Sequence, residues 1–181
     1  TLRNCIIQNN ITSGSAVFQL NGVAGSTKKF VFENCLIVNN ESGIESAAFL
    51  ITANAQVDII NCTIANNLVS TPGNAHTFAI NASAGVVLNV SNSIIYGNRV
   101  GNQLAACVSS IAATKNLKNN AWDMEATSGT LNNNIQLKAT PFVSTSRFVG
   151  VANATDKIFN AITGSDFSLK ASSGCVNKGN N

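Results

Sequence analysis

One nine-residue stretch, present in four copies, constrains this chain more than any other feature. It reads LRNCIIQNN at residues 2–10, FENCLIVNN at 32–40, IINCTIANN at 59–67 and, more weakly, VSNSIIYGN at 90–98. The leading Asn recurs at intervals of 34 − 4 = 30, 61 − 34 = 27 and 92 − 61 = 31 residues. A period of this length indicates a repeat architecture, in which each unit buries its apolar face against its neighbours.

Each copy is interpreted as two short strands joined at an Asn. Before the Asn, apolar and polar residues alternate, so that Phe30 and Phe32 share one face while Glu33 points to the other. This period of two is typical of a half-buried strand. The apolar register shifts at the Asn, and Asn tolerates the left-handed backbone of a sharp corner better than most residues do.

A third strand fits between the copies, at residues 16–20, 47–51, 77–80 and 104–108. Three strands and three corners per turn predict an all-β fold: a right-handed, single-stranded parallel β-helix with three parallel sheets and about five to six rungs. Equivalent residues of successive rungs then stack about 4.8 Å apart. We expect a buried amide ladder at the corner and a ladder of small inward side chains, formed respectively by Asn4, Asn34, Asn61 and Asn92 and by Cys5, Cys35 and Cys62.

The repeats fill residues 1–131, and the regular repeat pattern is lost afterwards. The end of a parallel β-helix is an open sheet edge, which proteins usually cover. We therefore expect residues 132–181 to form the last rung and an irregular C-terminal cap of the same domain.

Composition excludes several classes of function. Only 10% of residues are charged and the net charge is +3, without the basic patch that nucleic acids require. No apolar run is long enough for a membrane span. Of the five Cys, three occupy the inward repeat position, so free buried thiols are expected there. With a single His and no C-x-x-C, no metal site or cofactor is predicted.

The chain begins within a repeat and without Met. We interpret it as part of a longer precursor whose signal peptide and N-terminal part are absent, and we expect a secreted or cell-surface location.

Three motifs carry a family resemblance: the N-C-x-I-x-N-N repeats, N-I-x-x-x-x-x-P-F-V from Asn134, and D-F-x-L-x-x-x-S-x-C-V-N-x-G from Asp166. Together they resemble right-handed β-helix proteins of the pectate-lyase-like superfamily, and more narrowly the secreted or surface β-helix proteins of Bacteroidetes. Those proteins often end in a segment close to D-F-x-L-x-x-x-S-P-C-I-D-A-G, from which this chain departs at Gly174, Asn177 and Lys178. The resemblance implies the fold, but the superfamily contains lyases, hydrolases and adhesins alike.

The function is predicted from the polar and ionisable side chains that we expect on the surface. The eight acidic residues are scattered over the repeats, whereas polysaccharide cleavage needs clustered ionisable groups or a metal. We therefore expect a non-catalytic carbohydrate-binding, adhesive or structural domain. The alternative is the C-terminal fragment of a polysaccharide lyase or glycoside hydrolase with its catalytic rungs upstream, and only that alternative implies calcium. The candidate sugar-binding residues are Gln19, Glu45, His76, Tyr96 and Trp122, although Trp122 is equally suited to filling the core.

Overall fold

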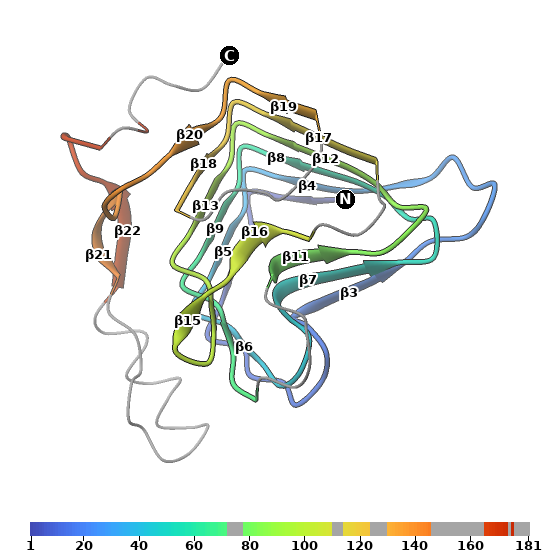
Figure 1. The fold of residues 1–181 in the computed structure, drawn as a ribbon, viewed down its shortest axis with the longest axis horizontal. Helices are drawn as coiled ribbons and strands as arrows, with labels where there is room; N and C mark the ends of the chain where they lie inside the picture. The colour runs from blue at the N-terminus through green and yellow to red at the C-terminus, as the bar shows by residue number, and fades with distance from the viewer. Residues whose placement is uncertain (72–77, 110–113, 124–129, 146–164, 174, 176–181) are drawn as a thin grey trace.

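The structure is a computed structural model that describes residues 1–71, 78–109, 114–123, 130–145, 165–173 and 175. These residues contain strands and no helix, and parallel sheets stack into a β-solenoid of about four turns (Figure 1). The predicted parallel β-helix is therefore confirmed.

Two six-stranded parallel sheets form most of the coil, and they meet at a corner along its length (Figure 1). Sheet A contains β1 (Leu2–Arg3), β4 (Lys29–Glu33), β8 (Gln56–Ile60), β12 (Val87–Ser91), β17 (Thr114–Lys118) and β19 (Thr130–Asn132). Sheet B contains β2 (Ile6–Gln8), β5 (Leu36–Val38), β9 (Thr63–Ala65), β13 (Ile94–Tyr96), β18 (Ala121–Trp122) and β20 (Ile135–Gln136).

The predicted third strand forms sheet D, which faces sheet A across the interior (Figure 1). A fourth, very short sheet C lies at the bend between sheets B and D and was not predicted. Sheet D contains β3 (Phe18–Asn21), β7 (Ser46–Thr52), β11 (Phe78–Ala82) and β16 (Ala106–Val108); sheet C contains β6 (Glu41–Ser42), β10 (Leu68–Val69), β14 (Arg99–Val100) and the antiparallel β15 (Gln103–Leu104).

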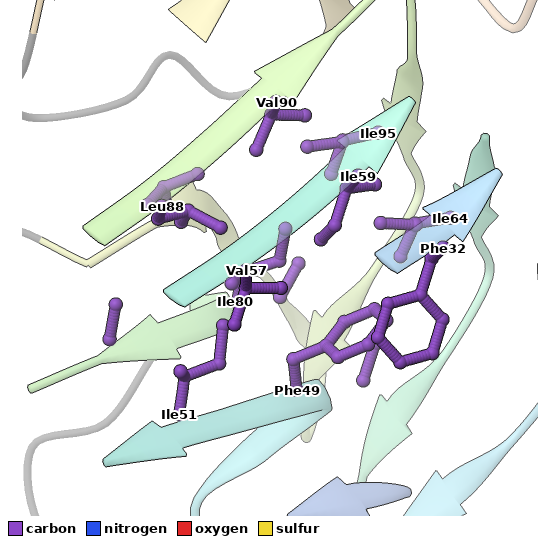
Figure 2. Packing of buried hydrophobic residues seen from close by; sticks show 14 of the residues in the cluster. Phe32, Phe49, Ile51, Val57, Ile59, Ile64, Ile80, Leu88, Val90 and Ile95 are labelled. Carbon is purple, nitrogen blue, oxygen red and sulfur yellow. The ribbon is translucent and has the colours of Figure 1, made fainter. Parts of the chain in front are cut away.

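The register of the coil follows the sequence repeat. Leu2 pairs with Phe32, Phe32 with Ile59, and Ile59 with Val90. The side chains of Phe32, Ile59 and Val90 point inward with those of sheets B and D, and rings and branched aliphatic chains fill the interior (Figure 2). In this core Phe49 packs edge-on against Phe32, with ring centroids 5.0 Å apart.

The last described turn is much shorter than the others. The corner Asn119 lies 119 − 92 = 27 residues after Asn92, but the next corner, Asn133, follows after only 133 − 119 = 14. Four turns thus have strands in sheets A, B and D, while β17–β18 and β19–β20 extend only sheets A and B. The sequence predicted five to six rungs, and the structure has four turns with all three of these sheets followed by two that extend only sheets A and B.

Residues 132–181 also contain an antiparallel hairpin, β21 (Phe142–Thr145) and β22 (Ser165–Leu169). It lies alongside the outer face of sheet B (Figure 1), where Phe142 packs with Val38 and Ala65. The hairpin covers a side of the coil. Whether this region caps the end stays a prediction, because residues 146–164 and 176–181 lie outside the described part.

Candidate functional site: the outer face of sheet A

The corner between sheets A and B is built as the sequence predicts, but its side chains are not buried. Asn4, Asn34, Asn61 and Asn92 all have φ between 51° and 53°, the left-handed region that Asn enters more readily than other residues with a side chain. Asn34 and Asn61 are nevertheless exposed. Placing a buried amide ladder at this corner was therefore wrong.

The buried amide ladder lies at the following corner, after sheet B. Asn10 donates from Nδ2 to Oδ1 of Asn40 at 2.8 Å, Asn40 to Asn67 at 2.9 Å, and Asn67 to Asn98 at 2.9 Å. These residues are the second Asn of each N-N pair, or the Asn of G-N in the fourth copy, so they share the same period. That shared spacing was the signal by which the sequence could have indicated them.

The thiol ladder is present. Cys35 and Cys62 are buried and Cys5 is half-buried, and all three are free. Each thiol donates to a backbone carbonyl two residues earlier, as Cys62 does to Ile60 O at 3.3 Å. Burial raises the pKa of Cys62 to about 11. Ser93 continues the ladder and donates from Oγ to Ser91 O at 2.8 Å.

The structure does not bring the predicted sugar-binding residues together. Gln19 is exposed on β3 of sheet D, and Glu45 is partly exposed in the bend before β7. Tyr96 is half-buried on the outer face of sheet B, with its ring centroid 6.1 Å from that of Phe142. Burial there and the Asp123 carboxylate raise the pKa of Tyr96. His76 lies outside the described residues.

Trp122 belongs to the core rather than to the surface. Its side chain is only 2% exposed and joins the main apolar cluster where the coil shortens. Trp122 is therefore not exposed for stacking on a sugar ring. The sequence could not predict whether Trp122 is buried or exposed, because an aromatic residue suits both an inward and an outward position.

A continuous polar row does cross the outer face of sheet A. Asn116 donates from Nδ2 to Asn89 Oδ1 at 2.8 Å, and Asn89 donates from Nδ2 to Asp58 Oδ1 at 2.6 Å. Lys29 Nζ completes the row at 3.1 Å from Asp58 Oδ2. The four residues come from the successive strands β4, β8, β12 and β17. Asp58, Asn89 and Asn116 pair in register, and Lys29 reaches Asp58 from two residues before Val31, the register partner of Asp58 on β4.

The chemistry of this row suits hydrogen bonding to neutral polar groups. An Asn amide has two N–H donors and two acceptor lone pairs, so each amide keeps capacity after bonding to its neighbour. Asn116 and the nearby Lys118 are exposed on β17. Sequence reasoning missed the row because its members lie 27–31 residues apart and form a line only once the register is fixed.

Two further observations concern metal ions and membranes. The part of the chain that the structure describes contains no group of three His, Cys, Asp or Glu side chains placed to hold a metal ion. Over the same residues, no helix is long and apolar enough to cross a membrane.

In comparisons with known proteins, no family model, no curated protein and no solved structure matches this chain.

Proposed function

We propose that this chain is a non-catalytic β-helix domain of a secreted or cell-surface protein, and that it binds carbohydrate through the outer face of sheet A. The motifs described above support placing it with the pectate-lyase-like superfamily and with bacterial surface proteins. The observation that carries the binding role is the row Lys29–Asp58–Asn89–Asn116.

A flat sheet face with a polar row suits an extended polymer. The register partners Asp58, Asn89 and Asn116 lie about one strand spacing apart, roughly 4.8 Å. Amide, carboxylate and ammonium groups held by hydrogen bonds to one another lose little freedom when a ligand binds, which lowers the cost of association. Sheet B offers no comparable surface, because Leu36, Val38 and Ala65 pack with the hairpin residue Phe142.

The test is binding of the purified chain to a panel of neutral and acidic polysaccharides, measured by affinity electrophoresis and on a glycan array. Asn116→Ala and Lys118→Ala remove exposed groups of sheet A and should leave the fold intact. Gln19→Ala, at an exposed residue of β3 in sheet D, is the matched control. We expect each sheet A variant to bind about fivefold more weakly, the loss typical of one hydrogen bond, and the control to bind as the parent does.

Absence of binding to every polysaccharide would overturn the proposal, and so would binding that only Gln19→Ala weakens. The same samples are assayed for new reducing ends and unsaturated products, with and without calcium, and no turnover is expected. Turnover would favour the lyase or hydrolase alternative.

A further inference from the structure

A second surface lies around the corner from sheet A, where the C-terminal hairpin meets the coil. Here a half-enclosed cleft of about 200 Å³ is bordered by three corner Asn residues, by sheet B and by the hairpin. Its volume exceeds the ~30 Å³ that one water occupies in the liquid and is smaller than the ~300–1,000 Å³ of pockets for drug-sized ligands. The size suits one small ring.

One wall of the cleft is a stack of amides. Asn92, Asn119 and Asn133 follow one another at the corner between sheets A and B, all with positive φ. Asn119 donates from Nδ2 to Asn92 Oδ1 at 3.2 Å. Among the described residues no hydrogen-bond partner exists for the side chain of Asn133, nor for Oδ1 of Asn119. The amides of Asn119 and Asn133 therefore have donors and acceptors available to a ligand.

The floor and the opposite wall are apolar. Ile94, Ala121 and Ile135 stack on the outer face of sheet B, and Leu169 of β22 lies across from them. Cys175 also borders the cleft and is half-buried there. Aliphatic groups on one side and stacked amides on another match a molecule that has a C–H face and a rim of hydroxyls.

We propose that this cleft binds a single pyranose unit, with its hydroxyls on Asn119 and Asn133 and its C–H face on Ile94 and Ile135. The inference rests on the proposed carbohydrate binding and adds a site for one sugar unit of the chain. Sheet A leads directly to the cleft, because Asn119 follows Lys118 at the end of β17. A polymer lying on sheet A can thus place one unit around the corner.

The experiment titrates ¹⁵N-labelled protein with glucose, galactose, N-acetylglucosamine and galacturonic acid, each as the free monosaccharide. We expect at least one of them to shift the side-chain amide signals of Asn119 and Asn133. The same sugar should slow alkylation of Cys175, located by mass spectrometry, because the sugar covers the thiol.

Gly substitutions remove the amides without straining a left-handed backbone. Asn119→Gly and Asn133→Gly should each weaken monosaccharide binding about fivefold, the loss of one hydrogen bond. Asn34→Gly is the matched control, since Asn34 has nearly the same φ at an exposed corner and does not line the cleft, and it should bind as the parent does. As a second variant, Ala121→Leu fills the floor and should abolish binding.

The outcomes separate this inference from the proposed function. Polysaccharide binding that Asn116→Ala weakens, together with no monosaccharide shift at Asn119 or Asn133, overturns the cleft and leaves the function standing. Monosaccharide binding that Asn133→Gly weakens, without any polysaccharide binding, supports the cleft and overturns the role of sheet A. Monosaccharide binding that none of the cleft variants changes also overturns the cleft.

Discussion

Asn40 donates a hydrogen bond from Nδ2 to Oδ1 of Asn67 at 2.9 Å, joining two turns of the coil across 27 residues of sequence. The same Oδ1 accepts the backbone N–H of Asn40 at 3.0 Å, and Asn67 Nδ2 donates to Ile37 O at 3.0 Å. Both residues are fully buried. Each amide thus satisfies backbone groups of the neighbouring turns as well as the next amide.

Removing one member of this inner ladder should be costly. Asn67→Ala leaves the Asn40 N–H and the Ile37 carbonyl without their partners inside the coil. Because an unsatisfied buried polar group costs about 1–3 kcal/mol, we expect the free energy of unfolding to fall by roughly 3 kcal/mol. Urea denaturation followed by circular dichroism measures the loss.

The matched control uses the corner that precedes sheet B. Asn61 is exposed and has φ 53°, so Asn61→Gly keeps the backbone conformation and should change stability by less than about 1 kcal/mol. Equal losses in Asn61→Gly and Asn67→Ala would contradict the assignment of the buried ladder to the second Asn.

Local sequence patterns were sufficient to predict the sheets and the corners, but not which Asn is buried. Alternation at Phe30 and Phe32 specifies an inward face by itself, and an Asn at a register shift specifies a left-handed corner. Asn34 and Asn40 are the same residue type at the same period, and only the direction in which the chain bends distinguishes them. That direction depends on packing across turns.

The sequence of β5 already indicated that the outer face of sheet B is covered. Leu36, Ile37 and Val38 are apolar on both faces of one strand, a pattern typical of strands buried on both sides. It indicated that something covers the outer face, while the covering residue, Phe142, comes about a hundred residues later. The partial burial of Tyr96 could not be predicted for the same reason. Phe142, which packs against its ring, lies far from it in the sequence.

The thiols should react in an order set by their burial. Cys35 and Cys62 are buried, so both should resist alkylation at neutral pH in the folded protein. In Cys62 burial also raises the pKa to about 11, which lowers the amount of the reactive thiolate. Cys5 and Cys175 are half-buried and should react first. Mass spectrometry after a timed iodoacetamide pulse gives the order, and full labelling in urea is the positive control. Rapid native labelling of Cys62 would argue against its place inside the coil.

Lys115 is a buried cation within the coil, and it makes stability depend on alkaline pH. It is 3% exposed, donates to the Ser109 carbonyl, and has a pKa lowered by burial. The unfolded state therefore binds more protons between the folded pKa and about 10.5, so stability rises with pH over this interval. Relative to the parent, Lys115→Met should gain most near neutral pH and lose that advantage as pH approaches 10.5.

Urea melts of both proteins at a series of pH values measure this difference. Lys118→Met is the matched control for the replacement of a Lys by Met, because Lys118 is exposed on the other face of the same strand. A constant difference between Lys115→Met and the parent over the whole interval would show that the Lys115 side chain is not buried as described.

The hairpin should separate from sheet B when its main contact is removed. Phe142 is fully buried, packs with Val38 and Ala65, and lies 5.2 Å, centroid to centroid, from Phe167. Phe→Ala at such a site costs about 3–5 kcal/mol. Since the inward core of the coil does not include Phe142, we expect Phe142→Ala to abolish the hydrogen-exchange protection of β21 and β22 while β8 stays protected.

A second measurement reports on the contact itself. Burial under the hairpin is the first cause of the raised pKa of Tyr96, so in Phe142→Ala the spectrophotometric titration of this single Tyr should move toward lower pH. Val143→Ala, at a residue 53% exposed on the same strand, is the matched control and should leave both the exchange protection and the phenol titration unchanged. If β8 instead loses protection together with β21, the hairpin and the coil unfold as one cooperative unit, and the hairpin contributes to the stability of every turn that it covers.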